Sequence, residues 1–370
     1  MGKLLFNVHD VVLLMTAGLT VVMAISLLTS RGRRQVDVVL AAFIVTQGLT
    51  SLCYLFLYNA VFSGPTVALL APFEFLPLTV LYYLQGVLLL TYSRGMAGES
   101  MMPSKNDKIL LAIVVGIPSL MVVILRELFD GNANPSNINI AASNPALAIS
   151  VYYGFLALVL VRKHNREIRH HFSNIDEINL IWLGYSTFGF VALWCVRLFN
   201  PGPIFHNYEL ARNIALVANY LPLFLVSWMV IVGIRHKQRI VEEPVDQSNT
   251  DKHQFDPELV NKLEDLMCRV KVNQDTHLSL EGLADSLDVS PRSASALING
   301  HYNQSFYDFI NGYRVSEAEQ ILGNPQQKEK PIQQVFEDVG FRSKSTFNAI
   351  FKKITGQTPT EYRRFSLNPR

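Results

Sequence analysis

Charged residues and cysteine are both scarce in this sequence. Asp, Glu, Lys and Arg together make up 17% of the 370 residues, against about a quarter in soluble domains, whereas hydrophobic residues make up 49%. The three cysteines do not support a disulfide framework, because Cys53 and Cys195 lie within apolar runs and Cys268 lies in the part expected in the cytoplasm, where thiols stay reduced. We interpret them as packing residues. The shortage of charge excludes an ordinary soluble protein and predicts long apolar segments.

Motifs of catalysis are lacking as well. The chain contains no HExxH, no GxSxG and no pair of Asp residues within its apolar segments. The usual catalytic motifs of intramembrane enzymes are therefore missing. His164, His170 and His171 lie in a basic segment, which we expect to be a solvated loop rather than a metal site. We therefore predict a protein that is not an enzyme, with no catalytic residues, no metal and no cofactor.

Apolar runs long enough to cross a membrane occupy most of the sequence before Arg235. A helix needs about 20 residues to cross a hydrocarbon core of about 30 Å. The first run lacks a basic leader beyond Lys3 and is followed by RGRRQ rather than by a small-residue cleavage site, so we expect a retained span rather than a signal peptide. The runs predict a seven-span transmembrane domain over residues 1–236. They cover about 8–29, 37–60, 66–92, 108–129, 147–162, 178–199 and 213–234.

Basic residues lie in alternate gaps between these runs. They follow the first, third, fifth and seventh runs, whereas the other gaps contain only Arg212. Cytoplasmic loops hold the excess of Lys and Arg, so the N-terminus is expected outside and the C-terminal part in the cytoplasm. We predict a multi-pass protein of the cell inner membrane. The basic residues are Arg31, Arg33, Arg34, Arg94, Lys105, Lys108, Arg162, Lys163, Arg166, Arg169, Arg235, Lys237 and Arg239.

Four ionisable residues fall near the outer ends of their predicted spans: Glu74, Arg126, Arg197 and Arg212. Such groups are costly in a membrane and normally face the interior of a helix bundle or a wet cavity. They predict a polar pocket, open to the outside, in which a signal binds. The alternative is that the arginines extend to the lipid headgroups.

The composition changes after the last apolar run. Residues 237–256 are acidic, polar and interrupted by proline, which is typical of a linker. Residues 257–370 have ordinary amphipathic patterning and the length of one soluble domain. The fold class we predict is all-α, a seven-helix transmembrane bundle followed by a soluble all-α domain.

Two helix-turn-helix patterns occur in the soluble domain. In the stretch "SLEGLADSLDVSPRSASALINGH" a short helix with an apolar stripe is followed by a turn and by a second helix capped at Ser290. The pattern returns in "PIQQVFEDVGFRSKSTFNAIFKKITG", with a turn at Gly340, a cap at Ser343 and a terminator at Gly356. A longer helix, "SFYDFINGYRVSEAEQIL", joins the two. The last helix is amphipathic, and its apolar face consists of Phe347, Ile350, Phe351 and Ile354.

This doubled pattern and the motif that closes it resemble the AraC/XylS family of transcription regulators. The signature of that family runs approximately GFxSxSxFxRxFKxxxGxTPxxYR, and the resemblance covers about residues 275–364. The apolar front end does not resemble the soluble sugar-binding domain common in the family, so nothing about ligands is carried over. The matching residues are Gly340, Phe341, Ser343, Ser345, Phe347, Phe351, Lys352, Gly356, Thr358, Pro359, Tyr362 and Arg363.

The resemblance implies that the second helix of each unit enters the DNA major groove. By position, the reading helices are residues 290–299 and 343–354. Ala349 stands where the signature usually has arginine, and Ala296 where a long polar residue is common, so readout rests on fewer or different contacts. The residues implied to contact DNA are Arg292, Ser293, Ser295, Ala296, Ser343, Lys344, Ser345, Thr346, Asn348, Ala349, Lys352 and Lys353.

Taken together, these patterns predict a membrane-integrated transcription regulator. It would couple a membrane or extracytoplasmic signal to gene expression through sequence-specific binding in the major groove. The alternative is a membrane transporter or receptor whose cytoplasmic tail binds protein or anionic lipid. The expected partners are double-stranded DNA, membrane lipid, RNA polymerase, an unidentified ligand or membrane partner, and a second copy of the chain as a homodimer.

Overall fold

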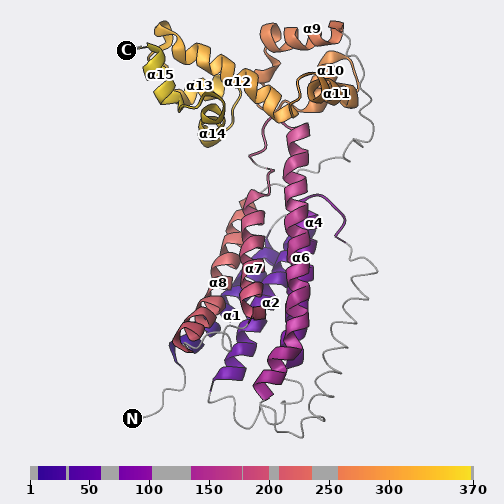
Figure 1. Ribbon diagram of the computed structural model, residues 1–370, viewed down its shortest axis with the longest axis vertical. Helices are drawn as coiled ribbons and strands as arrows, with labels where there is room; N and C mark the ends of the chain where they lie inside the picture. The colour runs from indigo at the N-terminus through magenta and orange to yellow at the C-terminus, as the bar shows by residue number, and fades with distance from the viewer. Residues whose placement is uncertain are drawn as a thin grey trace. The chain divides into compact units, whose positions relative to one another are not determined.

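The computed structural model describes residues 7–30, 33–59, 75–101, 135–176, 178–199, 208–235 and 257–367. Their regular secondary structure is helical (Figure 1), and one isolated antiparallel bridge joins Phe172 to Ser279. The predicted all-α class is confirmed. By internal contacts the chain forms two compact units, which we call the first unit (Met1–Arg162 with Leu180–Gln238) and the second unit (Lys163–Asn179 with Arg239–Arg370).

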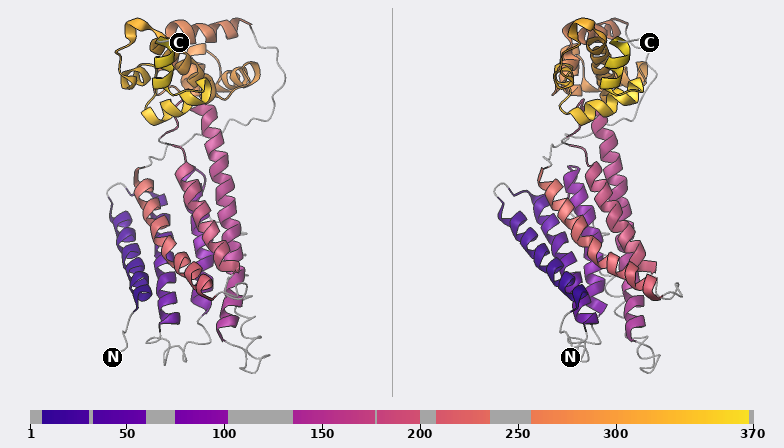
Figure 2. Two further views of the ribbon diagram at one scale, coloured as in Figure 1. Left: turned by 60° about the vertical axis from the view of Figure 1, so that its left-hand side comes forward. Right: turned by 90° about the vertical axis from the view of Figure 1, so that its left-hand side faces the viewer.

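The first unit consists of long apolar helices. In both views of Figure 2 they lie side by side along a common direction. A capping box defines the start of α1. The side chains of Asn7 and Asp10 each accept a hydrogen bond from the backbone N–H of the other residue. The helices are α1 (Val8–Thr29), α2 (Gln35–Tyr58), α4 (Phe75–Met96), α6 (Pro135–His171), α7 (Ile181–Phe199) and α8 (Tyr208–Arg235).

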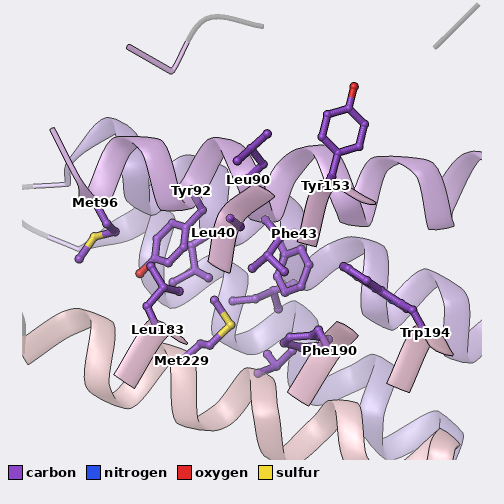
Figure 3. Close-up of a cluster of buried hydrophobic side chains, with 14 of the residues drawn as sticks. Leu40, Phe43, Leu90, Tyr92, Met96, Tyr153, Leu183, Phe190, Trp194 and Met229 are labelled. Atoms are coloured by element: carbon purple, nitrogen blue, oxygen red, sulfur yellow. The ribbon is translucent and has the colours of Figure 1, made fainter. Parts of the chain in front are cut away.

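The core of the first unit is built from several of these helices. Figure 3 shows side chains that converge from α2 (Phe43), α4 (Tyr92), α7 (Phe190, Trp194) and α8 (Met229). α4 and α6 approach closely at Gly86, where a Cβ atom would lie 2.6 Å from the Cα of Ser150. Large apolar side chains are exposed as well. Among them are Val22, Phe188, Phe224 and Trp228.

Four helical segments among the described residues are long and apolar enough to cross a membrane. They are Val8–Thr29, Gln35–Phe56, Asn144–His171 and Ile181–Leu198. Val217–Gly233 in α8 is a shorter apolar helix, and α4, which covers most of the third predicted span, is not among the four. The fourth predicted span, residues 108–129, lies outside the described residues. The count of seven spans therefore stays a prediction, as do the boundaries 1–236, 237–256 and 257–370.

The end of α6 differs from the predicted basic loop. The helix continues through His171, and His164 is buried, with its Nε2 atom 3.4 Å from the carbonyl oxygen of Ile178. The prediction of a solvated loop is therefore wrong for His164, because the chain after α6 folds back over it. Within the described ranges no cluster of three or more His, Cys, Asp or Glu side chains is placed to hold a metal ion.

The C-terminal part of the second unit contains two helix-turn-helix pairs, as predicted. The pairs are α10/α11 and α13/α14, and α12 lies between them (Figure 1). The helices are α9 (Pro257–Asp265), α10 (Leu280–Leu287), α11 (Pro291–His301), α12 (Phe306–Gly323), α13 (Ile332–Asp338), α14 (Lys344–Thr355) and α15 (Pro359–Leu367).

Local chemistry sets the ends of the second helix of each pair. The hydroxyl of Ser290 accepts a bond from the N–H of Ser293 (3.1 Å), and that of Ser343 accepts one from Thr346 (3.2 Å). α14 ends at Gly356, which has the left-handed φ of 78°. Gly340 has a φ of 93°, and a Cβ there would lie 2.7 Å from the carbonyl oxygen of Gln274. Glycine is therefore required in the second turn on two counts.

Each pair has its own apolar core. The first core includes Leu283, Leu287 and Leu297, and the second is built around Phe347 and Phe351, which have no exposed surface. Ile354, predicted on the same apolar face, is 50% exposed instead. It lies in the last turn of α14, just before the chain leaves the helix at Gly356.

Candidate nucleic-acid interface

α14 turns a polar and cationic face away from the core. Because Phe347 and Phe351 point inward, the opposite side of the helix is exposed. Ser343 lies at the N-cap, where the free backbone N–H groups of the first turn can receive an anion. Thr346 and Asn348 are half-buried at the edges of this face. Its exposed members are Lys344, Ser345, Ala349, Lys352 and Lys353.

α11 presents a smaller face of the same kind. Arg292 and Ser293 are exposed, whereas Ser295 and Ala296 are half-buried. The hydroxyl of Ser295 accepts a hydrogen bond from the side-chain amide of Asn299 (3.1 Å). Arg292 is thus the long cationic side chain that this helix offers. We call the exposed polar faces of α11 and α14 the reading surface.

The cations of the reading surface differ in their surroundings. The ammonium group of Lys353 lies 3.4 Å from the carboxylate of Asp308, and the two side chains are 70% and 40% exposed. An exposed pair of this kind contributes little and is screened by salt, so Lys353 can exchange Asp308 for a phosphate. Lys352 and Lys353 also lie in the last turn of α14, where the helix dipole favours positive charge.

Arg314, which the sequence analysis did not single out, ties α12 to the chain around it. It has no exposed surface, and its guanidinium donates to the carbonyl oxygens of Asn273 (2.7 Å) and Asp275 (2.8 Å). Burial lowers the pKa of Arg314 to about 10, although the nearby charges of Asp275 and Tyr307 oppose that shift. The group remains cationic at neutral pH. Its position one turn after buried Ile310 was the signal that could have revealed it.

The predicted signal pocket can be placed only in part. Glu74 and Arg126 lie outside the described residues, and Arg212 lies on α8 with its side chain outside them. Arg197 lies on α7 and donates to the hydroxyl of Tyr82 (3.2 Å). It also donates to the carbonyl oxygen of Ala218 (2.9 Å). These contacts favour the bundle interior over the headgroups for this arginine. The four-residue pocket stays a prediction.

Comparison with known proteins identifies the type of the C-terminal domain. Residues 283–364 match a protein-family model described as a helix-turn-helix domain. The chain is 30% identical over 89 residues to the arabinose operon regulatory protein of Salmonella typhimurium, an alignment that covers 24% of this chain and 31% of that protein. It is 25% identical over 111 residues to the transcriptional regulatory protein HptR of Staphylococcus aureus, covering 30% of this chain and 41% of that protein.

These matches leave most of the chain without a counterpart. The chain spans less than half the length of the curated relatives it matches. No solved structure matches significantly. The C-terminal domain is thus an AraC-type helix-turn-helix domain, similar to those of the two transcription regulators.

Proposed function

We propose that this protein is a membrane-integrated transcription regulator whose AraC-type domain binds double-stranded DNA in response to a membrane or extracytoplasmic signal. The observation that carries the proposal is the pair of capped helices, α11 and α14, in one family-matched domain that presents exposed polar and cationic faces. A second helix of this kind fits the major groove, which is about 12 Å wide. RNA polymerase and a second copy of the chain are further partners that a regulator of this type would use.

Each side chain of the reading surface has a distinct proposed role. Lys344 and Asn348 lie where they would reach base edges, because they belong to the first turns of α14. Lys352, a full turn later than Asn348, would bind phosphate. The small side chain of Ala349 leaves space and no hydrogen bond, so discrimination between sequences rests on its neighbours.

Substitutions on α14 should separate these roles. Lys344→Ala or Asn348→Ala should weaken binding and change the preference among DNA sequences, by about 1–3 kcal/mol at the contacted base pair. Lys352→Ala should weaken binding to all sequences nearly equally and lower the slope of log affinity against log salt by about one. The measurement is a fluorescence-anisotropy titration of the full-length protein in detergent, at several salt concentrations, with DNA selected from a random library.

A matched control comes from the same domain. Arg269 is exposed, pairs with Asp265 at 2.9 Å and lies outside both helix-turn-helix pairs. Arg269→Ala removes one positive charge and should leave affinity and preference nearly unchanged. If all three α14 variants bound DNA like this control at moderate salt, the proposed docking would be wrong.

Membrane integration is the second part of the proposal. It is supported by the four long apolar helical segments and by the apolar side chains, such as Phe188 and Phe224, on the outside of the first unit. In lipid such helices satisfy their own backbone hydrogen bonds, which makes them suited to span it. The alternation of basic gaps then gives seven spans with the N-terminus outside.

Reporter fusions test this topology directly. A reporter that is active only in the cytoplasm should work when fused after Arg34, Arg166 or Lys237, because these residues lie in the basic gaps. The same reporter should fail after Pro135 or His206, and a periplasmic reporter should show the reverse pattern. Cytoplasmic activity at Pro135 would contradict the seven-span arrangement.

A further inference from the structure

The second unit includes a segment that belongs, by sequence, between two apolar helices. Residues Lys163–Asn179 comprise the last turns of α6 and the chain that leads to α7, and we call them the clasp. The clasp is held to the DNA-binding domain by backbone and side-chain bonds. The hydroxyl of Ser173 donates to the carbonyl oxygen of Leu278 (2.7 Å), and the amide of Asn174 donates to that of Thr276 (2.8 Å).

The clasp also binds the connecting helix α12. Arg314 donates to the carbonyl oxygen of Ser173 (3.2 Å) and to its hydroxyl (3.1 Å). The clasp thus supplies two of the acceptors around the buried guanidinium of Arg314. Loss of an acceptor is costly for a buried charged group. Nearby, the guanidinium carbon of Arg169 lies 5.6 Å from the ring centre of Tyr307 on α12.

Apolar contacts extend the clasp to the reading helix. Ile168, Ile175 and Ile178 are buried together with Tyr307, and Ile350 of α14 packs against this group. Ile350 also packs against the core of the second helix-turn-helix pair. The clasp therefore contacts α12 and α14 at once, so its docking and the position of α14 are linked.

Asp176, near the end of the clasp, contacts the edge of the reading surface at Thr346. The hydroxyl of Thr346 donates to Oδ1 of Asp176 at 2.6 Å, while Oδ2 is buried without a hydrogen-bond partner. Thr346 is one of the residues proposed to face DNA. A carboxylate held there repels phosphate and occupies the hydroxyl that DNA would use. Docking of the clasp and docking of DNA therefore oppose each other at this point.

We propose that the clasp is an autoinhibitory element, which lowers DNA affinity when docked and raises it when released. The inference rests on the proposed function, because it concerns regulation of the same reading surface. α6 and α7 flank the clasp in sequence, so a rearrangement of these helices acts on it through the chain itself. A signal then shifts the balance between docked and released clasp through its different affinity for the two states.

The test compares Asp176→Asn and Asp176→Ala with wild type, as full-length protein in detergent micelles, in titrations of one selected DNA fragment. Removal of the carboxylate should lower Kd about fivefold or more, the lower end of typical coupling between sites. Asp176→Asn keeps the shape of the side chain and guards against misfolding. The matched control is Glu167→Gln, which removes a negative charge from the same segment. Glu167 pairs with Lys163 at 3.7 Å, with side chains that are 34% and 62% exposed, and such a solvent-accessible pair contributes little. The Kd of Glu167→Gln should stay within about twofold of that of wild type.

Hydrogen exchange provides a second readout that does not depend on the variants. The coupling is reciprocal, so saturating DNA should release the clasp of the wild-type protein. Exchange of peptides over residues 172–179 should then rise, since the amide of Ser173 is bonded to Leu278. Unchanged or weaker DNA binding by both Asp176 variants, or a clasp more protected with DNA than without, would overturn autoinhibition. Absence of DNA binding by wild type and variants alike would instead overturn the proposed function.

Discussion

Phe351→Ala is expected to unfold the second helix-turn-helix pair. The Phe351 ring has no exposed surface, and its centre lies 5.5 Å from that of Phe347 and 5.4 Å from that of Tyr362. Truncation of a buried phenylalanine costs about 3–5 kcal/mol, because the transfer free energy is lost and a cavity remains. That is a large part of the 5–15 kcal/mol, approximately, by which a domain is stable. DNA binding should be lost with the fold.

Ile354→Ala is the matched control for this prediction. It lies on the same helix three residues later, is also apolar, and is 50% exposed. Its truncation should cost well under half as much, because half of the Ile354 surface stays in contact with water in the folded protein and little apolar burial is lost. Hydrogen exchange of peptides over residues 332–364 in the full-length protein measures both effects. Equal protection in the two variants would show that Phe351 does not hold this pair together.

Arg314→Met is expected to have the second largest effect. The substitution keeps an unbranched side chain of similar length but removes every donor from a buried site. The carbonyl oxygen of Asn273 then loses the donor that Arg314 supplies. Those of Ser173 and Asp275 lose one donor each but keep another, the side-chain amide of Asn311 (3.4 Å) and the backbone N–H of Leu278 (3.2 Å). A hydrogen bond to a charged group contributes about 1.5–3 kcal/mol, and a buried carbonyl left unsatisfied costs about 1–3 kcal/mol. The combined loss should therefore be about 3 kcal/mol or more unless water enters.

The measurement for Arg314 is a urea titration followed by a probe confined to the second unit, such as exchange of α12 peptides. Arg314→Lys retains the charge but not the planar fork of donors, and should recover part of the loss only. Arg269→Met, at a side chain that is 83% exposed, should leave the midpoint nearly unchanged. A midpoint for Arg314→Met equal to that of the Arg269 variant would show that these hydrogen bonds contribute nothing net.

Local signals in the sequence predicted much of the C-terminal domain. Ser290 and Ser343 were recognised as helix starts, and Gly356 as an end, because capping depends on residues a few positions apart. Gly340 was predicted in the turn of the second pair, and its left-handed φ of 93° favours glycine there. The structure adds a second reason, the carbonyl oxygen of Gln274 in contact range, which only the fold brings there.

Contacts between distant segments could not be predicted in this way. The clasp contacts α14 through Asp176 and Thr346, which are 170 positions apart. A periodic pattern in the sequence cannot predict a pair at that separation. The sequence analysis placed its basic residues in an exposed loop, because charge is normally solvated. The buried positions of His164 and Arg314 depend on the same packing. Ile354 shows the converse, since helical periodicity alone cannot tell where a core ends.

The prediction of membrane spans in residues 1–236 depends on patterns of a different kind. Long apolar runs follow from the thickness of a bilayer, so four of the predicted spans coincide with long apolar helical segments. The number of spans needs every segment, and residues 108–129 lie outside those described. The signal pocket depends on side chains that meet across several helices, and only Arg197 of its four residues has a described environment.

The central claim is that one chain, held in the membrane, binds specific DNA. Genome-wide crosslinking of the intact protein, recovered from the membrane fraction, tests it most directly. The account predicts enrichment of a limited set of promoter fragments that share a sequence motif, lost in the Lys344→Ala, Asn348→Ala double variant at equal protein level. Recovery of no DNA above that double variant, or of the protein only in the soluble fraction, would contradict it.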